Sequence, residues 1–99
     1  MNKDLSFLED LGFDKAYMTE MTDIFPDTVK DTIVENKETV IDNVNYLKNL
    51  GISNYQDAFI RFYNMFLIEP SSFDDIFSKY DKEDLIVKLE KNIAIMEHL

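Results

Sequence analysis

The sequence has no cysteine, a single histidine and only two glycines, and each of these shortages excludes a class of functional site. Without cysteine, the chain has no disulfide, no thiolate nucleophile and no cysteine-bound metal. The histidine, His98, is the penultimate residue, where a positive charge suits a helix C-terminus, and no second histidine completes a zinc site. The glycines, Gly12 and Gly51, are too few for a phosphate-binding loop. We therefore expect no metal and no cofactor.

Long apolar runs and alternating strand patterns are also missing. No segment approaches the length needed to span a membrane, and the N-terminus lacks the apolar region of a signal peptide. Apolar and polar residues rarely alternate, and the chain contains no Asn-Gly or Asp-Gly hairpin turn. We therefore expect a cytoplasmic, all-helical protein without a membrane segment.

Positive charge is scarce. Ten basic residues face 20 acidic ones, which gives a formal net charge of −10. At long range such a charge repels phosphate backbones and anionic membranes. An acidic surface can serve solubility alone, or it can attract a basic partner or imitate nucleic acid, and composition leaves these interpretations open.

A phrase of eight residues occurs three times, at 4–11, 43–50 and 92–99. In every copy the second, fourth, fifth and eighth residues are apolar, and an Asp or Asn stands first. Gly12 and Gly51 follow the first two copies and suit left-handed helix stops. Repetition of this kind is typical of helical repeat proteins.

Apolar spacing predicts helices along the whole chain, which at 99 residues forms one domain, 1–99. The fold we expect is all-α, with five to six helices packed as antiparallel hairpins in a short helical-repeat array. The expected segments are about 4–11, 14–24, 38–50, Tyr55 to just before Pro70, a short helix capped by Ser71 or Ser72, and Asp81 to the C-terminus; a short helix at 27–35 stays open.

The clearest stripe belongs to the segment that follows Tyr55. Its apolar residues recur at helical spacing through Phe66, and further apolar residues lie off this stripe. A helix that is apolar on more than one side is buried on more than one side, so we expect this one at the centre of the fold.

The stretch Tyr46–Ser53, with the helix and the triplet Phe66–Ile68 that follow, resembles the repeat of the mitochondrial transcription termination factor family. That repeat has a Leu-Gly-x-Ser turn, a helix, a proline fourteen residues after the glycine and an apolar pair beyond. Pro26 lies fourteen residues after Gly12, whereas Met65 occupies the matching position after Gly51. The resemblance implies a curved stack of helical hairpins that binds nucleic acid through a basic concave face.

Nucleic-acid binding is the first alternative function, although the sequence supplies no basic cluster. The chain has one arginine and nine lysines scattered among acidic neighbours, whereas phosphate recognition needs clustered positive charge. This alternative predicts that four basic side chains converge on one surface: Lys48, Arg61, Lys88 and Lys91.

Catalytic residues do not stand out. The serines fall mostly at expected caps and turns, where their hydroxyls satisfy free N–H groups, and none is paired with an evident base. The acidic runs at 74–75 and 81–84 lack the glycine and terminal glutamate of a calcium-binding loop and suit first helical turns. Paired carboxylates stay open, because folding brings distant acids together. A small enzyme of no recognised type is the second alternative.

The leading interpretation is a non-enzymatic protein–protein interaction module, with a regulatory or inhibitory role through its acidic surface as one version. The partner we expect is a protein, basic in that version, and neither nucleic acid nor membrane. Two groups of residues are the candidates for contact with it: an apolar group that a short first helix covers incompletely, Tyr17, Met18 and Met21, and an acidic helix face, Asp74 and Asp75. The sequence leaves the oligomeric state open.

Overall fold

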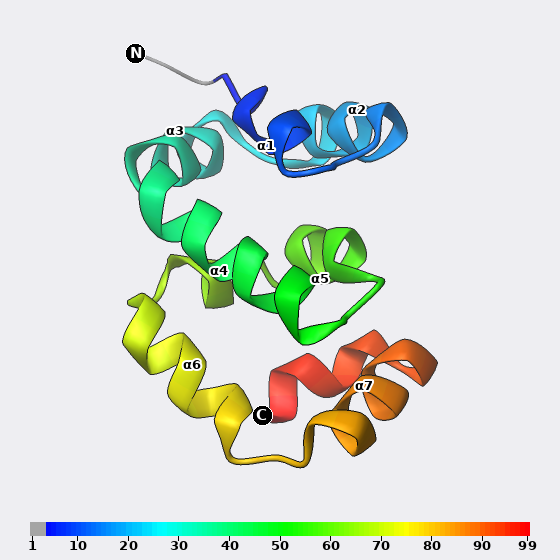
Figure 1. The fold of residues 1–99 in the computed structure, drawn as a ribbon. Coiled ribbons are helices and arrows are strands. Elements are labelled where there is room, and N and C mark those ends of the chain that lie inside the picture. Colours follow the sequence, from blue (N-terminus) through cyan, green and yellow to red (C-terminus); the bar gives the residue numbers. More distant parts are fainter. Residues whose placement is uncertain (1–3) are drawn as a thin grey trace.

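Helices joined by short turns make up residues 4–99, the part that the computed structural model describes (Figure 1). The all-α prediction is confirmed. The number of segments in this range exceeds the five to six expected, because the stretch 27–35, which the sequence left open, forms a helix and because two expected helices are each divided into an α-helix and a 3₁₀ helix. The segments are α1 (Phe7–Asp10), α2 (Lys15–Ile24), α3 (Asp27–Glu35), α4 (Lys37–Leu50), α5 (Tyr55–Arg61), η1 (Tyr63–Leu67), α6 (Pro70–Ser78), α7 (Lys82–Lys91) and η2 (Ile93–His98).

The first division falls at Phe62, so the prediction of one helix running to Pro70 is wrong. Phe62 has φ −132° and ψ 44°, and the chain continues as η1. The Asn43 side chain, only 1% exposed, donates its amide hydrogens to the carbonyls of Phe66 at 3.0 Å and Ile68 at 2.9 Å. A continuous helix would leave the Phe66 carbonyl without a donor, because Pro70 has no N–H. Asn43 supplies that donor and stabilises the 3₁₀ segment.

The second division falls at Asn92, so the last helix does not reach the C-terminus as an α-helix. Asn92 is extended (φ −152°, ψ 98°), and its side-chain oxygen accepts the backbone N–H of Ala94 at 3.1 Å. In the first copy of the repeated phrase, Asp4 accepts the N–H of Ser6 at 2.9 Å in the same way. The first residue of the phrase therefore starts a turn in copies one and three, whereas Asn43 lies inside α4.

Both glycine turns have the predicted left-handed conformation. Gly12 has φ +99° and Gly51 has φ +104°. In each turn the residue after the glycine donates its N–H to the carbonyl five positions back, at 3.2 Å in the first turn and 3.1 Å in the second. This bond is typical of a Schellman motif. The side chains of Phe13 and Ile52, which follow the glycines, point into the core.

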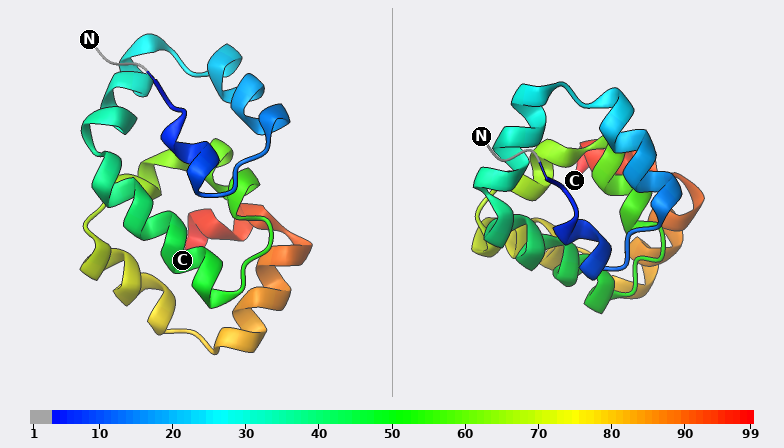
Figure 2. Two further views of the ribbon diagram at one scale, coloured as in Figure 1. Left: turned by 45° about the horizontal axis from the view of Figure 1, so that its top comes forward. Right: turned by 90° about the horizontal axis from the view of Figure 1, so that it is seen from above.

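The first turn docks on the second through polar contacts. The Leu11 carbonyl, just beyond the end of α1, accepts hydrogen bonds from Lys48 Nζ at 2.6 Å and Tyr55 Oη at 3.3 Å. The Asp14 N–H donates to Gln56 Oε1 at 2.7 Å. Both views in Figure 2 place the end of α1 next to α4. These contacts join the first and second copies of the repeated phrase.

The turn at Gly51 packs against α7. Asn54 Nδ2 donates to the Leu89 carbonyl at 3.0 Å, and Ser53 Oγ donates to Glu90 Oε2 at 2.8 Å. Within the fold, α1 packs on α2, α3 on α4 and α7 on η2. The result is a short stack of helical layers whose principal extents are 41 × 26 × 22 Å.

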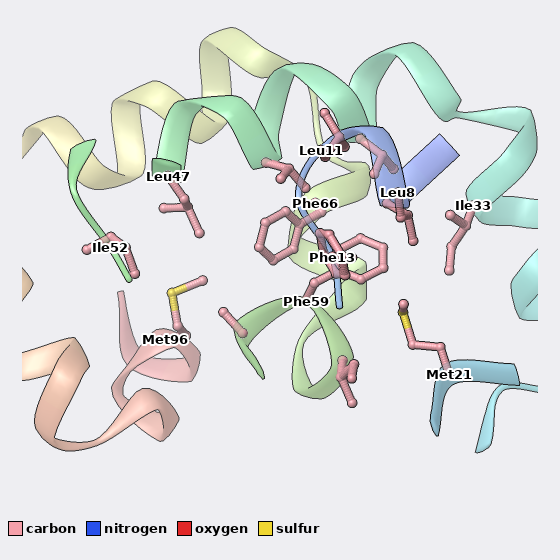
Figure 3. Packing of buried hydrophobic residues seen from close by; sticks show 14 of the residues in the cluster. Leu8, Leu11, Phe13, Met21, Ile33, Leu47, Ile52, Phe59, Phe66 and Met96 are labelled. Carbon is pink, nitrogen blue, oxygen red and sulfur yellow. The ribbon is translucent and has the colours of Figure 1, made fainter. Parts of the chain in front are cut away.

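The core gathers around α5, which packs against α2, α4, η1 and η2 and confirms the predicted central helix. Figure 3 shows Phe59 and Phe66 among apolar side chains from the first turn, α2, α4 and η2. Five rings run in series from the first turn to α6, with successive centroids 5.6, 5.1, 5.4 and 4.8 Å apart: Phe13, Phe59, Phe66, Phe73 and Phe77. Such aromatic pairs add specificity beyond the area they bury.

Two helix starts differ in how well the sequence predicts them. The Asp81 carboxylate accepts the N–H of Asp84 at 3.3 Å, which confirms the expected cap of α7. Helix α6 begins at Pro70 with Glu69 as its N-cap, so the expected caps at Ser71 or Ser72 are wrong. Proline suits the first helical turn because its missing N–H has no partner there.

The glycine turns predict a stability coupling between Gly12 and Tyr55. A Cβ at position 12 lies 2.6 Å from Tyr55 Oη, and its φ disfavours L-residues by roughly 1–2 kcal/mol. We expect Gly12→Ala to lower the free energy of unfolding by more than that strain alone, since the Tyr55 hydroxyl must also move. In a Tyr55→Phe background the loss should shrink, and urea unfolding of the four proteins measures this coupling. Equal losses in both backgrounds contradict the contact.

The buried amide predicts a large loss for Asn43→Ala. Two carbonyls lose their donor, so unfolding free energy should fall on the order of 2–4 kcal/mol. Asn49→Ala, an exposed change on the same helix, is the control and should cost under about 0.5 kcal/mol. Chemical denaturation measures both variants. Similar small losses for the two would show that Asn43 does not hold η1.

Candidate functional site

The apolar residues predicted for partner contact do not form one exposed patch. Met21 has no exposed surface and belongs to the core, so it is not available to a partner in this conformation. Tyr17 and Met18 are half-buried and pack against the core cluster from α2. The reason is that Met21 points into the core cluster (Figure 3), while α1 packs on α2. Of the three, Met18 also lines a surface groove.

The predicted acidic residues lie elsewhere. Asp74 and Asp75 are exposed on α6, at the opposite end of the molecule from α2 (Figure 1). The structure therefore does not bring them together with Tyr17 and Met18. The Asp74 carboxylate instead acts on Tyr46, which lies on α4. Burial and this carboxylate raise the pKa of Tyr46 to about 12.

A groove of about 410 Å³ lies where the N-terminal segment, α2 and α3 meet. Figure 2 shows α1, α2 and α3 together at this end of the fold. The lining combines apolar side chains, hydroxyls, three carboxylates and one ammonium: Asp4, Leu5, Ser6, Glu9, Met18, Thr19, Thr22, Asp23 and Lys30. Here, this set is called the N-terminal groove.

One cation of the chain already occupies this groove. Lys30, on α3, donates from Nζ to the Thr22 carbonyl at 2.8 Å. Thr22 lies in the last turn of α2, and the N–H that would reach its carbonyl belongs to position 26, which is proline. The carbonyl therefore has no backbone donor along the helix, and Lys30 supplies one.

The carboxylates make the groove negative. The Ser6 backbone N–H, bonded at 2.9 Å, holds the pKa of the Asp4 carboxyl below its usual value, so this group is charged at neutral pH. Glu9 and Asp23 are exposed at the groove. The C-terminal end of α2 adds the negative end of its helix dipole. The groove lining thus combines carboxylates and the C-terminal end of α2 with the ammonium of Lys30.

The basic residues of the nucleic-acid alternative have separate local roles. Lys48 bonds the Leu11 carbonyl and lies 5.6 Å from the centre of the Tyr55 ring. Lys88 pairs with Asp84 at 3.0 Å on the exposed face of α7. Two of the four cations are thereby engaged within the fold. Lys91 is exposed at the end of α7.

Arg61 lines a second groove, of about 400 Å³, between the two 3₁₀ segments. Glu97 shares this groove and carries the opposite charge. Its remaining lining is mainly apolar: Phe62, Asn64, Met65, Met96 and Leu99. The sequence did not predict either groove, because both depend on how distant segments meet. The sequence held one sign of the bond that Lys30 makes. Pro26 has no N–H, so the Thr22 carbonyl four residues earlier needs a donor from elsewhere.

Residues 4–99 contain neither a cluster of metal ligands nor a membrane-spanning helix. In that range no three His, Cys, Asp or Glu side chains are grouped as ligands for a metal ion. Nor does the described part of the chain contain a helix with the length and apolarity needed to cross a bilayer.

Comparison with protein-family models, curated proteins and solved structures finds no match to this chain. The resemblance to mitochondrial transcription termination factor repeats consequently rests on the residues alone and stays a prediction. The likeness of the Gly12 and Gly51 turns shows an internal repeat of local geometry, which is a property of this chain and not of a family.

Tyr46 predicts a specific loss of stability in alkali. In the unfolded chain a tyrosine loses its proton near pH 10, whereas folded Tyr46 keeps it to about 12. Between these values the folded state binds more protons, so the free energy of unfolding falls as pH rises. We expect urea midpoints of the wild type to fall more steeply above about pH 10 than those of Tyr46→Phe. Identical slopes for the two proteins would rule out this ionisation as a cause.

Proposed function

We propose that this chain is a non-enzymatic protein-interaction module that binds a basic protein partner at the N-terminal groove. One observation carries the proposal: the groove is open to solvent, and the exposed carboxylates of Glu9 and Asp23 line it together with one ammonium, Lys30. Its apolar lining, Leu5 and Met18, can contact the aliphatic part of a cationic side chain. Lysine and arginine commonly bury their stems along such surfaces while the charge stays accessible.

The charge of the whole chain supports the same partner class. A formal charge of −10 speeds encounter with basic surfaces and slows encounter with phosphates. Lys48 and Lys30 bond backbone carbonyls, so part of the positive charge is committed to holding helices. A regulatory or inhibitory role in the cytoplasm, in which the module masks a basic surface of its partner, fits this arrangement.

The proposal predicts that removing negative charge from the groove abolishes binding of the partner. The double variant Glu9→Gln with Asp23→Asn removes two charges and keeps side-chain size. We expect proteins of high isoelectric point to cross-link to the wild type in cells of the source organism and not to this variant. The matched control, Asp42→Asn with Glu83→Gln, removes two exposed charges outside the groove and should keep them.

Nucleic-acid binding is the alternative outcome, and fluorescence anisotropy with labelled DNA and RNA at about 50 and 200 mM salt tests it. We expect no binding at either concentration. Binding that weakens steeply with salt would contradict our proposal, because it would require several phosphate contacts. Partner retention by the groove variant at the wild-type level would contradict it as well.

A further inference from the structure

We propose that this chain forms a two-fold dimer through the second groove, in which Arg61 of each copy pairs with Glu97 of the other. The groove lies between η1 and η2 and has a volume of about 400 Å³. Its lining is mainly apolar, and its two charged side chains carry opposite signs. It shares no lining residue with the N-terminal groove, so this inference does not depend on the proposed function.

Apolar side chains that the fold covers incompletely make up most of the second groove. Phe62 and Met65 are half-buried at the break between α5 and η1, and Leu99 is half-buried after η2. Met96, with 1% of its surface exposed, belongs to the core beneath them. Aromatic residues, methionine and arginine are the types enriched at protein–protein interfaces. The groove therefore has the composition of a surface that another protein covers.

The two charged side chains of this groove do not pair with each other. Arg61 lies in the last turn of α5 and Glu97 lies in η2, and both are exposed. Among residues 4–99 neither has an ion-pair partner. A guanidinium can bind a carboxylate through two parallel hydrogen bonds, which makes this pair stronger than one between single contacts. The monomer thus presents a donor fork and an acceptor at one groove, and it uses neither.

A second copy of the chain supplies a partner for both charges at once. In a two-fold interface, a residue i of one copy contacts residue j of the other while j contacts i. A groove that holds one cation and one anion can therefore be complementary to itself. The pair between Arg61 and Glu97 then forms twice, and the apolar linings of the two grooves face each other.

The charge of the chain limits where two copies can meet. Each copy carries a formal charge of −10, so most orientations bring acidic surfaces together and repel. Lys30 and Lys48 cannot relieve this repulsion freely, because both are bonded to backbone carbonyls. At the second groove a strongly basic partner would face Arg61 and an acidic one would face Glu97. A copy that carries both charges suits the groove better than either.

Sedimentation velocity of the full chain between about 10 µM and 1 mM tests this dimer. We expect a monomer–dimer equilibrium in that range, with an NMR shift of the Met65 methyl over the same concentrations. Arg61→Glu and Glu97→Arg should each weaken dimerisation about tenfold or more, because either change places like charges at both pairs. The control Lys79→Glu alters charge equally at an exposed site outside the groove, and it should weaken dimerisation less than about threefold.

Mixing the two charge-reversed variants separates specific pairing from general repulsion. One variant has two acidic side chains at these positions and the other has two basic ones, so a mixed dimer regains both pairs. We expect the mixture, and also the double variant Arg61→Glu with Glu97→Arg, to dimerise about as tightly as the wild type. A mixture of Lys79→Glu with Glu97→Arg has the same net charges but regains one pair only, and it should dimerise more weakly.

Three results would overturn this inference: a monomer at every concentration, a dimer that both single variants keep at wild-type strength, or a mixture that dimerises no better than its components. Circular dichroism checks that each variant stays helical, which we expect because both side chains are exposed. If a variant does not fold, the Met65 methyl of the wild type decides, since a dimer formed elsewhere would leave its signal unshifted.

Discussion

Backbone carbonyls at helix ends are the constraint on which this fold depends, because side chains from other segments must supply their missing donors. Leu11 receives Lys48 and Tyr55, Thr22 receives Lys30, Phe66 receives Asn43, and Leu89 receives Asn54. Each carbonyl lies where a helix stops or breaks, so it lacks the N–H of the next turn. Three of these carbonyls receive donors at least 23 positions away in the sequence. The same bonds that close helix ends therefore also join the layers of the stack.

For two of these carbonyls, those of Thr22 and Phe66, a proline explains why a side-chain donor is needed. Pro26 and Pro70 each remove the N–H that a continuing helix would offer to the carbonyl four residues back. Asn43 meets this need in the core, where it is nearly inaccessible, and an unpaired carbonyl there would be costly. Lys30 meets it at the surface, beside exposed carboxylates. The buried bond holds η1 against α4, whereas the exposed one ties α3 to the end of α2.

Local chemistry made part of this structure predictable. The left-handed turns follow from Gly12 and Gly51, and the cap of α7 follows from the spacing of Asp81 and Asp84, because each depends on neighbouring residues alone. The break at Phe62 was not predictable in this way. The apolar period continues through Phe62, and the deciding hydrogen bonds join Asn43 to the carbonyls of Phe66 and Ile68, which lie 23 and 25 residues further along the chain. Met21 and Met18 look alike on a helix period, yet packing buries one and leaves the other at the groove.

Our account claims that side-chain amides close helix-end carbonyls across the stack, and one spectrum tests that claim most directly. A long-range HNCO experiment on the uniformly labelled protein detects nitrogen–carbonyl couplings through hydrogen bonds. We expect cross-peaks between Asn43 Nδ2 and the Phe66 carbonyl and between Asn54 Nδ2 and the Leu89 carbonyl. Absence of both cross-peaks, with side-chain amide protons that exchange freely with water, would contradict the account.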